Sequence, residues 1–365
     1  MITTTIFPSR YVQGFRATER LGEALKRYGQ RAFLICDPFA LDELVPRFRE
    51  ALEREVTGHF ERFGGESSEG EIGRLADAAR AQEAEVIVGI GGGKTLDTAK
   101  AVAHALERPV AIVPTIASTD APCSALAVIY SPEGAFERYL FLPKNPELVL
   151  VDTDIIVRAP VRFLVAGMGD ALSTYFEADA CRQRYAPNMT GDPGSVTAYA
   201  LAELCYHTLL EYGLAAKTAC ERQAVTPAFE RVVEANTLLS GLGFESGGLA
   251  ACHAIHNGLT VLHETHGAWH GEKVTIGVLA QLFLSDKSWA TIDEVYRFCA
   301  SVGLPTTLED IGLKGVDDAA LRQVAERACA EGETIYHEPR PVTPEAVVDA
   351  LKAADAEGRR RRQQA

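Results

Sequence analysis

One glycine-rich stretch, residues 89–97 with the sequence GIGGGKTLD, restricts the fold of this chain more than any other segment. It follows the apolar run at residues 86–88 and leads into a segment with helical spacing over residues 98–106. A strand, a glycine turn and a helix N-terminus together present backbone N–H groups that suit a phosphate. Glycines let the main chain approach an anion where a Cβ would obstruct it. The stretch therefore predicts a phosphate-binding turn, although its spacing matches neither the P-loop nor the GxGxxG pattern.

Short apolar runs alternate with amphipathic segments in the first part of the chain. The predicted strands are residues 32–36, 56–63, 86–88, 110–113 and 148–151. The predicted helices between them are residues 41–53, 71–81 and 98–106. This alternation predicts a mostly parallel sheet with helices on both faces. Two further strand-like runs, residues 124–130 and 137–142, flank a Pro132-Glu133-Gly134 turn and predict a hairpin beside the nucleotide site.

Polar residues follow three of the predicted strands. Asp37 follows the first strand, the glycine turn follows the third, and residues 115–120 follow the fourth. Ligands of parallel sheets bind at the carboxyl ends of the strands. The three segments are therefore expected to share one ligand site.

Strand patterning largely disappears after about residue 160, where Pro160 suits the first turn of a helix. The segments with helical periodicity are residues 196–210, 226–239, 274–284, 292–302, 319–330 and 344–354. We therefore expect an N-terminal α/β Rossmann-like domain with a mostly parallel sheet, residues 1–158, and an all-α domain, residues 159–365. The basic run at residues 359–362 is expected to be a solvated, frayed tail rather than a binding patch.

The charge balance limits the classes of partner. With 36 basic and 50 acidic residues the formal net charge is −14, which disfavours nucleic acid and anionic membranes. The eight cysteines are widely spaced without a CxxC pair, which indicates a reducing compartment. The N-terminus lacks the pattern of a signal peptide, and no run of 18 uncharged apolar residues is present. We therefore expect a cytoplasmic protein.

Residues suited to metal binding occur in the second half. Asp170 lies in an apolar stretch, where an unpaired carboxylate costs several kcal/mol. His253 and His256 are three residues apart on one helical face. One carboxylate and two imidazoles make up a catalytic divalent-metal site with an open coordination position, although a helix cap for Asp170 and a core position for His253 also fit. Spacing alone leaves three candidates for the distal imidazole: His263, His266 and His270.

Four segments resemble the glycerol dehydrogenases: residues 89–97, 114–124, 243–248 and 253–258. These enzymes belong to the metal-dependent, iron-type alcohol dehydrogenases, which share a fold with the dehydroquinate synthases. The similarity runs from about Tyr11 to residues 331–335, almost the whole chain. The resemblance implies a dehydroquinate synthase-like fold and the reversible, NAD-dependent oxidation of glycerol to dihydroxyacetone. It also implies a homo-oligomer.

The resemblance implies roles for individual residues. Asp170, His253 and His270 would hold one divalent metal, zinc or alternatively iron, because His270 lies in the family's His-Gly-Glu-Lys run. Asp120 would contact the substrate. The residues expected to bind NAD are Asp37, Gly91, Gly92, Gly93, Lys94, Asp97, Thr115, Ser118, Thr119, Ser124, Leu126 and Tyr130.

Physical chemistry fits these roles. The amides of the glycine turn can hold the pyrophosphate, and Asp37 can accept hydrogen bonds from the ribose while repelling a 2′-phosphate, so NAD is expected rather than NADP. The metal would act as a Lewis acid that lowers the pKa of a polyol hydroxyl, and the resulting alkoxide would pass a hydride to the nicotinamide. Asp120 could fix a second hydroxyl, which favours a vicinal diol. His256 is a candidate for the proton path, and helix packing is the alternative reading of this residue.

Other functions are weighed against this one. A related dehydrogenase could act on another small vicinal diol, such as 1,2-propanediol or its ketone hydroxyacetone. A dehydroquinate synthase-type lyase, or a dehydrogenase of glycerol phosphate, would need several cations near the site, and the flanking stretches supply only Lys273. A binding protein without catalysis is disfavoured because Asp120 and the three metal candidates are all present.

Two departures from the family pattern are expected to matter locally. The loop at residues 262–269 is about one residue shorter than in relatives, which affects the approach to His270. Tyr336-His337 stands where relatives have His-Asn, which affects the rim of the site.

Overall fold

The computed structural model describes residues 2–364 and forms two compact units. The sheet unit comprises Ile6–Val161 and Ala219–Gly241, and the helical unit comprises Met1–Thr5, Arg162–Thr218 and Leu242–Ala365. The division after Val161 lies three residues beyond the expected boundary at residue 158, and residues 219–241 return to the sheet unit. The helical periodicity of that returning segment gave no sign of which unit it joins.

Six strands form one sheet in the sheet unit, and every adjacent pair is parallel. The strand order is β1-β8-β5-β4-β2-β3. The strands are β1 (Tyr11–Gly14), β2 (Arg31–Cys36), β3 (Thr57–Arg62), β4 (Val86–Gly91), β5 (Val110–Pro114) and β8 (Leu148–Asp152). The predicted parallel sheet is confirmed. Only β1 was not predicted, because this short strand is half-buried and lacks an apolar run.

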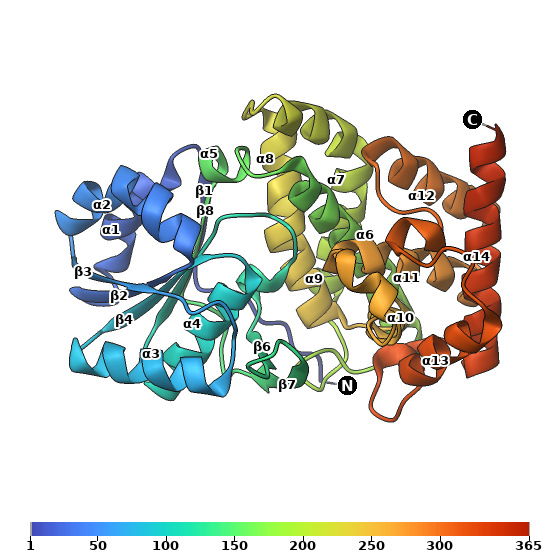
Figure 1. Cartoon of the computed structure of the whole chain (residues 1–365), viewed down its shortest axis with the longest axis horizontal. Coiled ribbons are helices and arrows are strands. Elements are labelled where there is room, and N and C mark those ends of the chain that lie inside the picture. Colours follow the sequence, from blue (N-terminus) through green and yellow to red (C-terminus); the bar gives the residue numbers. More distant parts are fainter. Residues whose placement is uncertain (1, 365) are drawn as a thin grey trace. The chain divides into compact units, whose positions relative to one another are not determined.

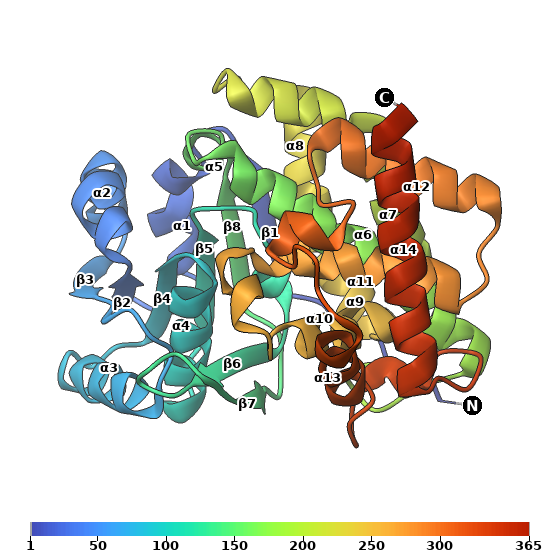
Figure 2. The ribbon, with the colours of Figure 1, turned by 45° about the vertical axis from the view of Figure 1, so that its right-hand side comes forward.

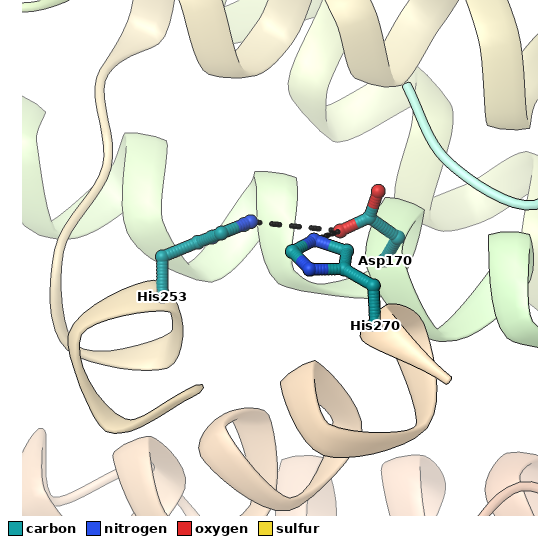
Figure 3. Close-up of side chains that lie close together, drawn as sticks. All are labelled: Asp170, His253 and His270. Atoms are coloured by element: carbon teal, nitrogen blue, oxygen red, sulfur yellow. Dashed lines mark hydrogen bonds and ion pairs between the residues drawn. The ribbon is translucent and has the colours of Figure 1, made fainter. Parts of the chain in front are cut away.

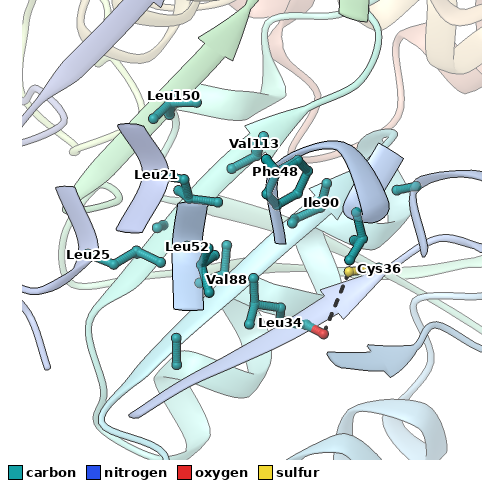
Figure 4. Packing of buried hydrophobic residues seen from close by; sticks show 14 of the residues in the cluster. Leu21, Leu25, Leu34, Cys36, Phe48, Leu52, Val88, Ile90, Val113 and Leu150 are labelled. Atoms are coloured by element: carbon teal, nitrogen blue, oxygen red, sulfur yellow. Dashed lines mark hydrogen bonds between the residues drawn. The ribbon is translucent and has the colours of Figure 1, made fainter. Parts of the chain in front are cut away.

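Helices cover both faces of the sheet (Figure 1). The helices α1 (Leu21–Leu25) and α2 (Val45–Glu53) lie on one face, and α3 (Glu69–Ala81) and α4 (Gly93–Ala105) lie on the other. Figure 4 shows alternate side chains of the central strands packed beneath α1 and α2. Burial of each such aliphatic side chain stabilises the fold by roughly 1.5–3 kcal/mol. The core residues labelled there include Leu21, Leu34, Phe48, Leu52, Val88, Val113 and Leu150.

The predicted hairpin is present as β6 (Leu126–Tyr130) and β7 (Phe136–Phe141), which pair in the antiparallel sense. A short helix, α5 (Thr153–Ile156), follows β8. The helix expected over residues 226–239 consists of α8 (Pro227–Glu234) and a π-helical turn, Ala235–Leu239. A π-helical turn holds one more residue than an α-helical turn, and periodicity alone does not reveal it.

The second half of the chain is built from helices, seen from a second direction in Figure 2. They are α6 (Val161–Arg184), α7 (Val196–Glu221), α9 (Ser240–Gly247), α10 (Ala251–Leu259), α11 (His270–Leu284), α12 (Trp289–Val302), α13 (Asp318–Ala328) and α14 (Pro344–Gln364). Within residues 2–364, no helix combines the length and the apolar composition that a membrane span requires. The expected all-α character of this half is confirmed, and α14 is ten residues longer than predicted.

The prediction of a frayed basic tail is wrong. Residues 359–362 form the last turns of α14, and each of their four arginines makes an ion pair. The acidic partners are Asp293, Asp310, Asp355 and Glu357. Two of these carboxylates lie three or four residues earlier on the same helix, a spacing that stabilises helices. The basic run is therefore neutralised within the fold.

Candidate functional site

The carboxyl edge of the sheet gathers three of the segments that the sequence singled out. Asp37 follows β2, Gly92 follows β4 and Thr115 follows β5, and these three strands are neighbours. The Asp37 N–H donates to the Ile90 carbonyl (3.1 Å), and the Thr115 N–H donates to the Gly91 carbonyl (3.0 Å). The three segments therefore lie side by side, as the strand order requires.

The glycine turn is tightly packed on one side and open on the other. A Cβ added at Gly91 would lie 2.6 Å from Asp37 Oδ2 and 2.8 Å from Thr95 Oγ1, so a larger residue would displace these side chains. A Cβ added at Gly93 would meet no atom within 4 Å. Helix α4 begins at Gly93, and no side chain caps its N-terminus. The turn therefore offers backbone amides at a helix N-terminus in a position that an anion can approach.

Lys94 is held beside the glycine turn by a carboxylate that sequence reasoning missed. Its Nζ donates to Glu66 Oε2 (2.6 Å) and lies 5.1 Å from the centre of the Tyr130 ring. Burial, with added repulsion from Asp97 and Glu66, raises the pKa of the Tyr130 hydroxyl. Glu66 lies 28 residues before Lys94 in a loop, so no local pattern links the two.

Asp97 contacts the hairpin of β6 and β7 and holds it against α4. Its carboxylate accepts the Val128 N–H (3.1 Å) and lies 3.5 Å from Nζ of Lys100. The Lys100 ammonium is fully buried and also donates to the carbonyls of Ala121 (2.6 Å) and Leu126 (2.8 Å). Burial raises the pKa of the Asp97 carboxyl against the opposing charge of Lys100. This buried pair ties α4 to the start of the hairpin.

The remaining residues predicted for the cofactor and the substrate lie on the segment between β5 and β6. Asp120 is buried, and its Oδ2 accepts a hydrogen bond from Ser240 Oγ (2.8 Å). Ser118 and Thr119 are half-buried, and Ser124 is buried with its Oγ 3.3 Å from Nζ of Lys100. The segment is thus ordered by buried contacts at both ends.

Three helices of the helical unit bring a carboxylate and two imidazoles together. Asp170 comes from α6, His253 from α10 and His270 from α11, and their side chains point toward one another (Figure 3). His270 Nε2 lies 3.0 Å and His253 Nε2 lies 3.5 Å from Asp170 Oδ1. The possible ligand atoms of the three residues all lie within 4.8 Å of one another. The structure therefore separates His270 from His263 and His266, which spacing alone could not do.

Glu177 is a partner of this cluster that sequence reasoning missed. Its Oε2 lies 2.6 Å from His253 Nδ1, and its Oε1 accepts the N–H groups of Ala250 (2.8 Å) and His253 (3.0 Å). An ionised carboxylate only accepts, so His253 Nδ1 is the donor, and Nε2, which faces Asp170, is the nitrogen that a metal could bind. Glu177 lies two helical turns after Asp170 on α6, and this seven-residue spacing between two carboxylates in an apolar helix could have identified it.

The charges of the cluster suit a bound cation. Burial opposes ionisation of Asp170, but His270 and His253 outweigh it, so the pKa of this carboxyl lies well below its usual range. Burial likewise opposes a charge on His253, but Glu177 and Asp170 raise the pKa of the imidazole well above its usual value. An imidazole between two buried carboxylates marks a place where positive charge is favoured. A divalent cation fits because it would bind the nitrogen lone pairs and neutralise Asp170.

Glycines allow the ligand-bearing helices to approach closely. A Cβ added at Gly271 on α11 would lie 1.8 Å from the Ala166 carbonyl oxygen on α6. A Cβ added at Gly169 would lie 2.3 Å from Thr275 Oγ1 of α11. These two glycines are the immediate neighbours of His270 and Asp170. Backbone contact between the helices therefore sets the separation of the two ligands.

The start of α11 is held by a salt bridge beside His270. The Trp269 N–H donates to Glu272 Oε2 (2.8 Å), and the guanidinium of Arg162 donates to both oxygens of Glu272 (2.6 and 2.8 Å). The loop before His270 contains a 3-10 helix, His263–Gly267, in which the Thr265 hydroxyl donates to the Leu259 and Leu262 carbonyls. His337 donates from Nδ1 to the Leu249 carbonyl (2.7 Å), just before α10.

A second buried carboxylate, Glu338, lies at the N-terminus of α10. It accepts the Ala251 N–H (3.3 Å) and a hydrogen bond from Ser285 Oγ (2.6 Å). Burial raises the pKa of Glu338 from 4.5 to about 7. The folded protein therefore holds this proton more tightly than the unfolded chain does. The stability contributed by Glu338 is present below pH 4.5 and is lost as the pH rises through about 7.

We expect the Glu338→Gln variant to gain stability relative to the wild type as the pH is raised from 5 to 8, by on the order of 3 kcal/mol. The amide has no charge to bury; its oxygen can accept the Ala251 N–H, and its NH2 group can donate to the Ser285 hydroxyl, which then acts as the acceptor. Urea unfolding at several pH values measures the difference. The Glu326→Gln variant, changed at an exposed side chain paired with Arg322, is the control and should show no such trend. A stability difference for Glu338→Gln that is constant with pH would contradict the assignment.

Comparisons with known proteins agree on one family of enzymes. A family model described as iron-containing alcohol dehydrogenase matches residues 8–153. The chain is 64% identical over 362 residues to a glycerol dehydrogenase of Thermotoga maritima, with 99% of each chain covered. It is 49% identical over 360 residues to a glycolaldehyde reductase of Halobacterium salinarum, covering 98% of this chain and 99% of the relative. Its fold matches the crystal structure of a glycerol dehydrogenase from Schizosaccharomyces pombe with a TM-score of 0.95 and 40% identity, covering 100% of this chain and 93% of that one.

Proposed function

The chain belongs to the iron-containing alcohol dehydrogenase family, and on this premise we propose that it oxidises glycerol to dihydroxyacetone with NAD and catalyses the reverse reduction. The observation that carries the proposal is the cluster of Asp170, His253 and His270, in which three helices aim one carboxylate and two imidazoles at a common point. An alcohol dehydrogenase of this family uses such a site together with NAD.

The metal is proposed to be held by Asp170, His253 and His270. Two nitrogens and one oxygen suit zinc, with iron as the alternative. A divalent cation bound there supplies Lewis acidity, which lowers the pKa of an alcohol hydroxyl. The contribution of the chain is to orient each ligand atom. Glu177 does this for His253 through the 2.6 Å contact to Nδ1.

The cofactor is proposed to bind at the carboxyl edge of the sheet. NAD supplies the hydride acceptor for oxidation of the alcohol carbon. The amides of Gly92, Gly93 and Lys94 would hold the pyrophosphate, because Gly93 opens onto free space at the N-terminus of α4. Asp37 would accept hydrogen bonds from the ribose hydroxyls. Thr115, Ser118, Thr119, Ser124, Leu126 and Tyr130 would complete the site.

Two features of this edge favour NAD over NADP. The carboxylate of Asp37 lies directly against the glycine turn, where a 2′-phosphate would meet its charge. Lys94, the cation beside the turn, is already paired with Glu66. Neither residue offers an unpaired positive charge for an additional phosphate.

Asp120 is proposed to contact a substrate hydroxyl. Its hydrogen bond from Ser240 holds the carboxylate in one orientation, and such a group accepts hydrogen bonds from a hydroxyl adjacent to the one that is oxidised. A second hydroxyl is common to glycerol and 1,2-propanediol. The similarity to a glycolaldehyde reductase adds a second candidate substrate, a small hydroxyaldehyde.

The cellular setting is also proposed rather than observed. Each of the eight cysteines is a free thiol, which suits a reducing cytoplasm.

Self-association into a homo-oligomer is suggested by exposed aromatic side chains on β7, where Phe136, Tyr139 and Phe141 lie together. Light scattering on the purified protein tests whether it forms a homo-oligomer.

The function is tested with the purified protein in both directions. NAD reduction is measured with glycerol, 1,2-propanediol, ethylene glycol or 1-propanol. NADH oxidation is measured with dihydroxyacetone or glycolaldehyde. We expect glycerol to be oxidised faster than 1-propanol, chelation to abolish activity, and zinc to restore it. Parallel assays with NADP should be slower. A metal-loaded protein that converts none of these substrates would contradict the proposal, and activity that survives complete metal removal would contradict the metal mechanism.

A further inference from the structure

We infer that His256 is a positioning residue for His270, because it accepts the Nδ1–H of that ring and thereby leaves Nε2, which faces Asp170, as the nitrogen that would bind the metal. The inference rests on the proposed function, since it concerns residues that would hold the metal. It differs from the expectation that His256 carries a proton.

The ring of His270 lies between two partners. Its Nδ1 is 3.0 Å from His256 Nε2, and its Nε2 is 3.0 Å from Asp170 Oδ1. A neutral imidazole has one N–H donor and one acceptor nitrogen. If Nδ1 carries the proton, Nε2 has the lone pair that a metal needs. The direction of the hydrogen bond between the two histidines therefore decides whether His270 can act as a ligand.

Asn257 decides that direction. His256 Nδ1 lies 3.2 Å from Asn257 Oδ1, and an amide oxygen only accepts hydrogen bonds. His256 therefore carries its proton on Nδ1, which leaves Nε2 as the acceptor for His270.

Glu333 sets the orientation of the Asn257 amide. Asn257 Nδ2 donates to Glu333 Oε2 (3.1 Å), and the other oxygen of Glu333 is ion-paired with Arg327 on α13. A carboxylate cannot donate, so the amide nitrogen must face it and the amide oxygen must face His256. A Cβ added at Gly258, next to Asn257, would lie 2.3 Å from the Val324 carbonyl, so α10 and α13 are in backbone contact here. The ion pair of Glu333 with Arg327 thus fixes the donor and the acceptor in each hydrogen bond that leads from Glu333 to the ring of His270.

This arrangement leaves no ring nitrogen of His256 for a substrate. Nδ1 is engaged with Asn257 and Nε2 with His270. A proton carrier would have to break one of these bonds in each cycle. The contacts of His256 are those of a hydrogen-bond partner that orients a metal ligand, a role commonly filled by a carboxylate or a carbonyl.

The test compares two substitutions of His256 in the full-length protein. His256→Gln places an amide near the position of Nε2, so it can still accept from His270, but it cannot carry a proton as an acid or a base. His256→Leu removes the acceptor. Zinc affinity of the metal-free protein is measured by competition with a chromogenic chelator, and the activity with glycerol is measured at saturating zinc. The visible spectrum of the cobalt-substituted protein reports the ligand geometry.

We expect His256→Leu to weaken zinc binding by about 10–100-fold and to change the cobalt spectrum. His256→Gln should bind zinc within about threefold of the wild type and keep most of its activity at saturating zinc, because acceptance of one hydrogen bond is the required property. Wild-type zinc affinity in His256→Leu would overturn the inference. Wild-type zinc affinity but no activity in His256→Gln would also overturn it, in favour of a proton carrier.

A remote substitution keeps the inference testable if His256→Leu does not fold. In Glu333→Ala the Asn257 amide can turn over, which would reverse both histidine hydrogen bonds and place a proton on His270 Nε2. We expect weaker zinc binding there as well, by about tenfold. His207→Leu, changed at an exposed histidine on α7, is the matched control and should bind zinc as the wild type does. Unchanged zinc affinity in Glu333→Ala would show that the hydrogen-bond chain has no positioning role.

The two proposals fail in different ways. Zinc affinity can be measured without any substrate. A protein that binds zinc but oxidises no small diol would contradict the proposed function. The zinc affinities of the variants would still decide the role of His256. A wild-type protein without affinity for zinc or iron would overturn both.

Discussion

Replacement of Asp170 by asparagine should lower kcat/KM for glycerol by about 10³-fold or more, because it removes the only charged oxygen of the ligand cluster. Zinc affinity should fall by a similar factor, equivalent to about 4 kcal/mol. The fold should persist because asparagine has the same shape, although the buried amide loses its interactions with His253 and His270. Both effects are measured by NAD reduction and by chelator competition.

A matched control lies on the same helix. Asp179 is also almost fully buried on α6, but it pairs with Lys287 (2.7 Å) and Arg182 (2.7 Å) outside the ligand cluster. Asp179→Asn should therefore reduce stability without changing zinc affinity. If Asp170→Asn and Asp179→Asn bound zinc equally well, the assignment of Asp170 as a metal ligand would be wrong.

Replacement of Gly271 by alanine should disrupt the metal site although alanine is an excellent helix former. The added Cβ would lie 1.8 Å from the Ala166 carbonyl oxygen, which belongs to the backbone of α6 and cannot rotate away. Overpacking of this kind costs about 1–3 kcal/mol, and the helices must separate to relieve it. His270 would then move away from Asp170. We expect at least a hundredfold weaker zinc binding and a lower midpoint of unfolding in urea.

Gly73→Ala tests whether this effect comes from the contact rather than from the loss of a glycine. Gly73 lies on an exposed face of α3, and a Cβ there would meet nothing within 4 Å. Alanine at this position should stabilise the protein by about 0.5–1 kcal/mol and leave zinc affinity unchanged. A Gly271→Ala variant that matched Gly73→Ala in both measurements would rule out a spacing role for Gly271.

The fold could be predicted where burial leaves a pattern in the sequence. Fully buried strands such as β2, β4, β5 and β8 produced continuous apolar runs, and the predicted parallel sheet is confirmed. The half-buried β1 produced no such run, and it joins the sheet by pairing with β8. The basic end of α14 was misread because its stabilising contacts to Asp293 and Asp310 come from distant segments.

The site was predictable to a different extent for each group of residues. Motif resemblance supplied the three metal ligands and the NAD residues, and these remain predictions for experiment. Local spacing could have supplied Glu177, which is two turns from Asp170 on one helix. No local pattern could have supplied Glu66 or Glu333, because their contacts with Lys94 and Asn257 join segments that only the tertiary fold brings together.

The π-helical turn at Ala235–Leu239 makes the number of residues in this segment, and not only their identity, important for the site. A π-helical turn corresponds to one residue inserted into an α-helix, and each inserted residue rotates everything after it by about 100°. Deletion of one residue here would convert the turn to regular α-helical spacing. Ser240 and Asp120 would both remain in the sequence, yet Ser240 would no longer face Asp120. A single-residue gap at this point in an alignment of relatives would therefore mark a change in how the Asp120 carboxylate is held, even where all the aligned residues are identical.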